Sequence, residues 1–330
     1  MDNNFFTPVV VTVCNRVNHI ERCLNSLINC NGFEKTDVYI AVDYPPNTAY
    51  EEGYFQVKKL LYERYSQFSN MHIILRSENV GALDNMICAI DYLLDECGYE
   101  KYICLEDDSE VSPNFLQFCN VCLFAYKNNN EVYGICGSSQ VWYGKGFVED
   151  THETSDYLRK MPFVWHGFAT WKNRYQEIIQ FCDEFDNVFK IKNLIKIHNE
   201  CKCFFYSLVS RRFSNPSQLP WKNNIVYPID FVWDIFMILH EKYIIFPTIN
   251  KVRDWGMDGS GVNFNTNEDK DMLISGMYLD TDFTFDIIND IPLNDKKEIQ
   301  RHNKFGCPKL PGKLKRLIIL ILYKLRIIKI

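Results

Sequence analysis

Short apolar runs alternate with segments of helical periodicity over residues 1–140. The runs cover residues 9–13, 38–42, 71–75, 102–105 and 133–136. The first is rich in β-branched residues, which is typical of a buried strand. Between them, apolar residues recur at the spacing of one helix face, over residues 20–28, 55–68 and 83–94. Asn18 and Glu21 fit a capping box before the first helix, and Pro113 predicts another helix start.

These elements predict an α/β fold. Because their connections are short, residues 1–140 should form a mostly parallel sheet covered by helices. The sequence after position 140 is less regular. It is rich in Gly, Trp and Tyr up to position 171, predicts a helix over 229–240 and a strand over 243–246, and has a glycine-rich loop at 254–263.

Polar residues come at or shortly after the ends of four predicted strands. They are Arg16, Asp43, Asn79 and the acidic triplet Glu106-Asp107-Asp108. Ligands of parallel sheets bind beyond the carboxyl ends of the strands. The four features should therefore converge on one edge of the sheet.

The acidic triplet suits a divalent cation. Three carboxylates at the end of a buried strand repel one another unless a positive group joins them. Mg²⁺ and Mn²⁺ accept carboxylate oxygens, and phosphate oxygens can complete their shell. The alternative is an ordinary solvated acidic loop, which the apolar strand before the triplet disfavours.

Composition and charge narrow the function classes. The chain is 47% hydrophobic and 24% charged, as globular proteins are. Its net charge of −6 gives no case for nucleic-acid binding. The 13 cysteines are odd in number and scattered, which favours reduced thiols in a cytoplasmic protein. Neither a signal peptide nor an apolar run long enough to span a bilayer is visible.

The C-terminal segment, residues 309–330, differs from the rest. Seven of its residues are basic and none is acidic, while Leu317 to Tyr323 form an unbroken apolar run. Residues 306–330 are therefore interpreted as a separate tail that attaches to an anionic membrane surface, which would place the protein peripherally on the inner face of the membrane. The alternative is a helix docked on the body or in an oligomer contact.

Four segments resemble one enzyme family, in order along residues 8–264. They are Pro8 to Arg16 with Arg22-Cys23-Leu24, Leu105 to Phe115, Trp165 to Trp171, and Pro247 to Asn250 with Asp254 to Gly261. The pattern resembles GT-A glycosyltransferases, most closely the N-acetylglucosaminyltransferase I type and its bacterial polysaccharide-biosynthesis relatives, which are glycosyltransferase family 2-like. The resemblance implies a Rossmann-like GT-A fold. Residues 1–140 would form its nucleotide-sugar-binding half and residues 141–305 its acceptor-binding and catalytic half.

The implied activity is transfer of a hexosyl or N-acetylhexosaminyl group from a nucleotide-diphosphate donor, expected to be a UDP-sugar. The acceptor would be a hydroxyl of a glycan or lipid-linked molecule in surface polysaccharide biosynthesis, with Mn²⁺ or Mg²⁺ as cofactor. Two alternatives stay open. One is a nucleotidyltransferase or sugar-nucleotide pyrophosphorylase, although Cys14-Asn15-Arg16 lacks the glycine-rich phosphate loop expected there. The other is a non-catalytic glycan-binding protein.

The resemblance also implies residue roles on the donor side. Asp108 would be the principal metal ligand, Asp107 would contact the ribose or the metal shell, and Glu106 the donor sugar. Asp43 would accept a hydrogen bond from the nucleobase, and Arg16 and Asn79 would lie beside the nucleotide.

On the acceptor side, Asp230 is preferred over Asp234 as the general base of an inverting displacement. The competing interpretation of Asp230 is a helix cap. The acceptor and closing-loop residues would be Trp165, His166, Trp171, Asp258 and Ser260. Asn263 stands where relatives often carry His, so it is not assigned to the metal. The aromatic residues, including Trp142, Tyr143 and Trp233, are more often core than sugar platform.

Overall fold

The structure is a computed structural model. It describes residues 6–138, 158–161, 166–214, 229–247, 249–260, 279–280, 303, 307 and 309–324. Trp142, Tyr143, Trp165 and Asn263 lie outside the described residues.

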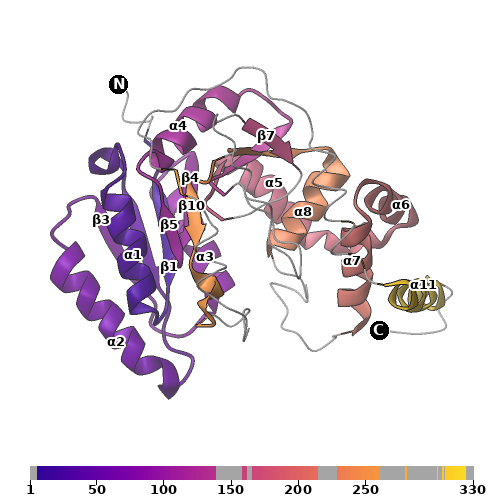
Figure 1. The fold of residues 1–330 in the computed structure, drawn as a ribbon, viewed down its shortest axis with the longest axis horizontal. Coiled ribbons are helices and arrows are strands. Elements are labelled where there is room, and N and C mark those ends of the chain that lie inside the picture. The colour runs from indigo at the N-terminus through magenta and orange to yellow at the C-terminus, as the bar shows by residue number, and fades with distance from the viewer. Residues whose placement is uncertain are drawn as a thin grey trace.

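An eight-stranded sheet runs through the molecule in the order β3-β2-β1-β4-β8-β6-β9-β7 (Figure 1). Strands β1 to β4 are parallel neighbours, β8 is antiparallel to both β4 and β6, β9 is parallel to β6, and β7 is antiparallel to β9. The predicted α/β class with a mostly parallel sheet is confirmed. The strands are β1 (Val9–Val13), β2 (Val38–Val42), β3 (Met71–Leu75), β4 (Lys101–Glu106), β6 (Val132–Cys136), β7 (Leu158–Met161), β8 (Phe168–Trp171) and β9 (Tyr243–Pro247).

Helices cover both faces of this sheet (Figure 1). They are α1 (Val17–Ile28), α2 (Glu51–Leu60), α3 (Ala82–Asp91), α4 (Phe115–Tyr126), α5 (Lys172–Asp183), α6 (Ile191–Glu200), α7 (Lys202–Ser214), α8 (Ile229–His240) and α11 (Leu310–Lys324). Within the described residues, every helix is too short or too polar to span a bilayer.

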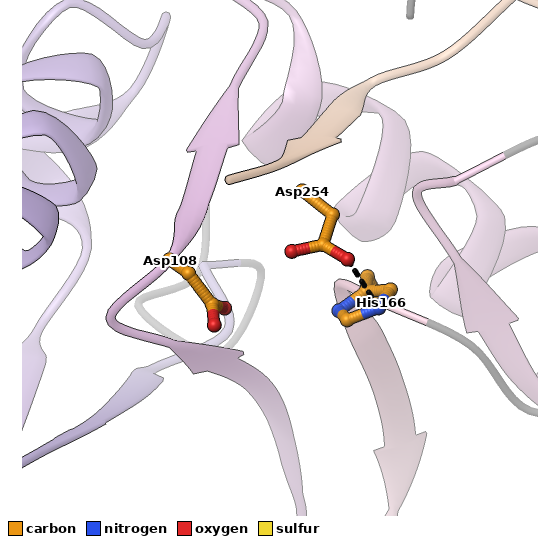
Figure 2. Close-up of side chains that lie close together, drawn as sticks. All are labelled: Asp108, His166 and Asp254. Atoms are coloured by element: carbon orange, nitrogen blue, oxygen red, sulfur yellow. Dashed lines mark ion pairs between the residues drawn. The ribbon is translucent and has the colours of Figure 1, made fainter. Parts of the chain in front are cut away.

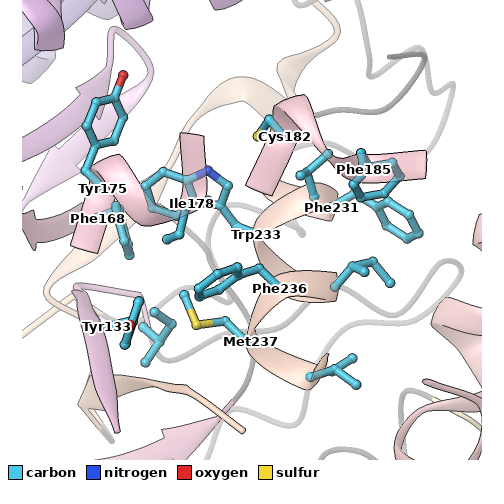
Figure 3. Close-up of a cluster of buried hydrophobic side chains, with 14 of the residues drawn as sticks. Tyr133, Phe168, Tyr175, Ile178, Cys182, Phe185, Phe231, Trp233, Phe236 and Met237 are labelled. Atoms are coloured by element: carbon cyan, nitrogen blue, oxygen red, sulfur yellow. The ribbon is translucent and has the colours of Figure 1, made fainter. Parts of the chain in front are cut away.

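Alternate side chains of β1 point to opposite faces of the sheet, and the apolar core accordingly has two clusters, one on each face. Val9, Val11 and Val13 join the cluster under α1 and α4, whereas Val10 joins the cluster that includes α3, α5 and α8. Figure 3 shows the second cluster, in which Trp233 meets Phe168 edge-to-face with ring centroids 4.7 Å apart. Trp233 is therefore a core residue.

The sheet contains strands from both predicted halves of the chain, since β6, β8 and β9 extend it beyond β4. The division at positions 140 and 305 stays a prediction.

Two helix starts differ from the prediction. Helix α1 begins at Val17 after Arg16, which makes no side-chain cap, so Asn18 lies inside the helix and the capping box is wrong. The side chain of Arg16 is instead directed to the acidic triplet. The helix expected at Pro113 begins at Phe115, because residues 113–114 form a turn.

A two-stranded ribbon beside the main sheet brings distant segments together. Strand β5 (Ser109–Val111) pairs antiparallel with β10 (Val252–Asp254), so that Asp254 lies opposite Ser109. The Trp255 N–H donates to the Asp108 carbonyl oxygen at 2.9 Å and extends the pairing by one step. This ribbon fixes residues 254–256 next to the acidic triplet.

A buried ion pair anchors the base of the ribbon. Lys251 is fully buried, and its ammonium group pairs with Asp280, which is also buried. The Asn114 amide donates to the same Asp280 carboxylate at 2.9 Å. One carboxylate thus joins the start of β10 to the start of α4.

Candidate metal centre

The acidic triplet lies in a tight turn between β4 and β5. Asp107 and Asp108 form this turn and are buried, with 4% and 7% of their surfaces exposed, whereas Glu106 ends β4 and is exposed. Successive strand residues point in opposite directions, but a turn can direct neighbouring carboxylates to one place. The turn lies at the carboxyl edge of the parallel strands, where the sequence placed it.

Arg16 reaches the turn from the neighbouring strand end. Because β1 pairs with β4, the residue after β1's loop lies beside Asp107 and Asp108. Its guanidinium donates to the Asp107 carboxylate at 3.0 Å through Nε and through a second, short Nη2 contact. Nη2 also donates to Asp108 Oδ2 at 2.8 Å. The predicted convergence of Arg16 with the triplet is thus present.

Only one of the two carboxylate oxygens of Asp108 accepts a hydrogen bond from Arg16. Among the described residues, its Oδ1 is buried and has no hydrogen-bond partner. A buried carboxylate oxygen without a donor is costly, unless a ligand approaches it. Figure 2 shows what lies nearby: Asp254 from the end of β10 and His166 from the segment before β8.

These three side chains form a cluster that could hold a cation. One ligand atom from each of Asp108, His166 and Asp254 lies within 4.8 Å of the others, and His166 Nε2 lies 3.2 Å from Asp254 Oδ2. Octahedral ligands about 2.1 Å from Mg²⁺ or Mn²⁺ are about 3.0 Å from one another. Small side-chain rotations would therefore suffice. Two carboxylates with one imidazole suit Mn²⁺, and carboxylates alone suit Mg²⁺.

A glycine leaves room at the centre of the cluster. A Cβ atom on Gly256 would lie 2.5 Å from Asp108 Oδ2. The backbone N–H of Gly256 donates to Asp254 Oδ1 at 2.7 Å. Any larger residue would push Asp108 aside. Gly167, next to His166, has a φ of 68°, a left-handed conformation that favours glycine. Both glycines hold the candidate ligands at short range.

Crowded carboxylates shift the proton affinities of the site. Burial would lower the pKa of His166, but the carboxylates around it outweigh burial and raise it; they belong to Asp254, Glu106, Asp108 and Asp230. Desolvation within the site and repulsion from Asp108 raise the pKa of Glu106 to about 7, although solvent reaches its exposed side chain and screens part of the repulsion. Burial raises the pKa of Asp107 to about 6 despite Arg16. A divalent cation would relieve this excess of negative charge.

The segment after Asp254 is fixed over the triplet. Trp255 Nε1 donates to Glu110 Oε2 at 2.6 Å, and the Arg22 guanidinium stacks 3.8 Å from the Trp255 ring. Asp258 accepts the Ser260 N–H at 2.8 Å and pairs with His19 of α1 at 3.2 Å. Asp258 therefore ties this segment, with the exposed Ser260, to α1, in the region where the sequence predicts a closing loop.

Asp43 and Asn79 bind each other at the next strand ends. The buried Asp43 carboxylate accepts four hydrogen bonds of 2.9–3.0 Å, from the N–H groups of residues 44, 80 and 81 and from the Asn79 amide. The Asn79 amide also donates to the Tyr44 carbonyl oxygen at 2.6 Å. Asp43 thus holds the loop after β3 against the end of β2, and a contact between Asp43 and a nucleobase stays a prediction.

The two candidate bases differ in exposure. Asp230 is exposed in the first turn of α8, where it accepts the Phe231 N–H at 2.8 Å. It lies close enough to His166 to raise the pKa of that imidazole. Asp234, one turn later, is buried. Because α8 begins at Ile229, Asp230 lies inside the helix rather than at its cap.

Trp171 lies away from the cluster. It pairs with Lys101 at the start of β4, whereas the triplet follows the end of that strand. Trp171 and the triplet therefore lie about five residues apart along β4, which corresponds to roughly 16 Å. The Trp171 ring stacks 3.5 Å from the Arg174 guanidinium, which donates to three carbonyl oxygens at and just after the end of α4. Trp171 is therefore a packing residue at the edge of the sheet where β4 begins, opposite the edge that carries the triplet.

Asp254 is the site residue that the sequence analysis did not assign. Its segment was assigned to a closing loop, but no local pattern in strands as short as β5 and β10 predicts that they pair across so long a separation. The role of His166, which was grouped with the acceptor residues, becomes that of a candidate ligand. The one local feature that could have indicated a site residue is the position of Asp254, an acid directly before Trp255-Gly256.

No family model matches the chain, and no curated protein matches it. Among solved structures, it is similar to S. aureus TarS 1–349 in complex with UDP-GlcNAc, with 13% identity over 54% of this chain and 47% of that one and a TM-score of 0.35. It is also similar to the mannosyltransferase PcManGT from Pyrobaculum calidifontis in complex with GDP-Man and Mn²⁺, with 14% identity over 53% and 46% and a TM-score of 0.35.

A third similar structure is the bifunctional glycosyltransferase WbbM, with 11% identity over 52% of this chain, 32% of that one and a TM-score of 0.31. The matched part spans less than half the length of each of these chains. Likeness at this level is partial and confined to the fold. A function has to be inferred from the geometry of the site.

Proposed function

We propose that this protein is a metal-dependent glycosyltransferase that moves a sugar from a nucleotide diphosphate to an acceptor hydroxyl. The observation that supports this most is the cluster of Asp108, His166 and Asp254, in which Asp108 also has a buried oxygen, Oδ1, without a hydrogen-bond partner among the described residues. It lies at the carboxyl edge of a parallel sheet, where such folds bind nucleotides. The donor is expected to be a UDP-sugar carrying a hexosyl or N-acetylhexosaminyl group, and the acceptor a glycan or lipid-linked molecule of a surface polysaccharide.

Asp108, His166 and Asp254 would hold the cation, Mn²⁺ or Mg²⁺. When bound, the ion supplies electrostatic stabilisation to the negative charge that develops on the leaving diphosphate. Arg16 supplies a second positive charge beside the same acids. Its side chain is 20% exposed, so it can contact a phosphate without leaving Asp107.

Asp230 is the candidate base. It lies exposed at the start of α8 and within electrostatic range of the cluster. In the proposed inverting step, the acceptor oxygen forms a bond to the anomeric carbon while the bond from that carbon to the diphosphate oxygen breaks. The hydroxyl proton passes to the Asp230 carboxylate. Asp234 is less suited because it is buried inside the helix.

A donor-turnover assay tests this function. The full chain is incubated with Mn²⁺ and a panel of nucleotide sugars, and release of nucleoside diphosphate is measured with and without glycan acceptors. We expect release from one donor class and a loss of at least about a hundredfold in D108N. The exposed Asp183, replaced in D183N, provides a matched control that keeps activity.

Two results would contradict the proposal. The first is equal turnover by D108N and the wild type. The second is release of pyrophosphate from a nucleoside triphosphate and a sugar phosphate, which would identify a nucleotidyltransferase instead.

A further inference from the structure

Helix α11 is docked on the body by one of its sides. It packs on α7, and Leu317 and Leu320 contact the larger core cluster. Arg316 Nη2 donates to the Ser210 hydroxyl of α7 at 3.1 Å, and the Lys313 ammonium lies 5.7 Å from the Tyr206 ring centroid. The helix therefore has a defined orientation, as predicted by the docked-helix alternative.

A second side of α11 is apolar and faces solvent. Leu314, Ile318 and Ile321 are 53%, 55% and 55% exposed. Their spacing of four and three residues places them on one face of the helix. A helix that docks by one apolar side is normally polar on the other, so packing among the residues that the structure describes does not account for these three side chains.

The charge of this segment indicates what the exposed face contacts. Residues 309–330 contain seven basic residues and no acid. The side chains of Lys309 and Lys315 are exposed, as are the three apolar side chains. Basic side chains beside an apolar helix face match a layer of anionic headgroups above acyl chains. In a two-fold contact between copies, the same basic residues would face one another and repel.

Helix α6, which also packs on α7, has a similar exposed side. Ile191 and Ile195 are 64% and 55% exposed and lie one turn apart, and Lys192 beside them is exposed. Both helices lie at the end of the molecule opposite α1 and α2 in Figure 1. The apolar and basic character is thus shared by two helices of this end.

We propose that the exposed face of α11, defined by Leu314, Ile318 and Ile321, binds the surface of an anionic lipid bilayer. The helix lies in the headgroup plane, with the exposed Lys309 and Lys315 among the lipid phosphates and its apolar face directed to the acyl chains. This binding does not depend on the proposed transfer activity. It would bring the protein to the surface on which lipid-linked acceptors are found.

Vesicle flotation tests the proposal. The full chain is mixed with phosphatidylcholine vesicles with or without about 30% phosphatidylglycerol, at low and high salt. We expect flotation with the anionic vesicles alone, weakened by salt. The triple variant Leu314→Gln, Ile318→Gln, Ile321→Gln should bind at least about tenfold more weakly, because it removes apolar surface and keeps good helix formers.

A double variant with equally exposed aromatic residues elsewhere is the matched control. Phe55 and Phe124 are 59% and 60% exposed, and F55Q/F124Q should float like the wild type. Circular dichroism establishes that both variants are folded. Equal flotation of the triple variant and the wild type would overturn the proposal, as would no flotation of the wild type. A wild-type dimer that the triple variant converts to monomer would also overturn it, in favour of a second copy as the partner.

Discussion

At the scale of single residues, the site is defined by two acids and an imidazole that come together from three separate parts of the chain. The position of His166 differs from the expected one, because the sequence predicts it among the acceptor residues rather than beside the acids. Its Nε2 lies 3.2 Å from Asp254 Oδ2, and the surrounding carboxylates raise its pKa. Its proton would have to leave before a metal binds.

We predict that His166→Gln weakens Mn²⁺ binding by at least about tenfold, because an amide is a poorer ligand than an imidazole. Titration calorimetry or the electron paramagnetic resonance signal of free Mn²⁺ measures this directly. His72→Gln is the matched control, since His72 also pairs with an aspartate, Asp37, at 3.3 Å but lies on β3. Unchanged affinity in H166Q would remove His166 from the ligand set.

The raised carboxyl pKa values predict a pH dependence of stability. The pKa of Asp107 is about 6 in the folded protein against an ordinary value of 3.8, and the pKa of Glu106 is about 7 against 4.5. The folded state therefore binds more protons than the unfolded state between about pH 4 and 7, and the free energy of unfolding falls as pH rises through this window. Thermal melts in EDTA should show this fall.

Two further melts identify its origin. Glu106→Gln should reduce the fall, because one of the repelling carboxylates is gone. Saturating Mn²⁺ should raise the melting temperature more at about pH 7.5 than at about pH 5.5, since the cation competes with protons at the site. A melting temperature that rises steadily from about pH 5 to 7 without metal would contradict the crowding of acids described here.

At the scale of elements, the β5–β10 ribbon determines whether the ligands meet. Its base rests on the ion pair between Lys251 and Asp280, both buried. Removing one member of a buried pair leaves an uncompensated charge, which costs about 3–5 kcal/mol. We therefore predict that Asp280→Ala lowers the free energy of unfolding by about that amount in urea titrations.

An exposed pair provides the comparison. Glu63 Oε1 lies 3.9 Å from Lys59 Nζ, one turn away on the surface. Glu63→Ala should therefore change the free energy of unfolding by less than about 0.5 kcal/mol. The double variant Lys251→Met, Asp280→Leu should recover much of the loss, because no charge is left buried. Equal effects of D280A and E63A would show that the ion pair does not anchor the ribbon.

The strands of the sheet were predictable from sequence because their signal is local. The runs at 9–13, 38–42 and 71–75 coincide with β1, β2 and β3. Strands β1 and β2 are buried on both faces and therefore need no alternation, whereas β3, at the edge of the sheet, is only partly buried. The strand ends then placed Arg16 beside Asp107 and Asp108. Pairings over long separations were not predictable, and these pairings bring Asp254 and His166 to Asp108.

Helix ends were predicted less well than the strands, because side-chain contacts from elsewhere decide them. The segment 55–68 contains the end of α2 at Leu60 followed by a π-helical turn at Leu61–Tyr65. Tyr65 in that turn donates to Asn25 of α1 at 2.9 Å. That contact joins the turn to another helix, which no periodicity within the segment could indicate.

At the scale of the whole molecule, one continuous sheet joins the two predicted halves, and the cluster lies where they meet. Asp108 follows β4 in the first half, while His166 and Asp254 come from the second. A cation bound there would link the halves and stabilise the folded state by mass action. Whether α11 holds the molecule at a bilayer is a separate property, because none of the three candidate ligands lies on that helix.

The most direct test of the central claim is anomalous diffraction at the manganese edge from crystals grown with Mn²⁺ and UDP. We predict one strong peak at roughly 2.0–2.3 Å from a carboxylate oxygen of Asp108, a carboxylate oxygen of Asp254 and a ring nitrogen of His166. UDP phosphate oxygens should complete its shell. A peak bound elsewhere on the chain, or none at this cluster with Mn²⁺ at millimolar concentration, would contradict the account.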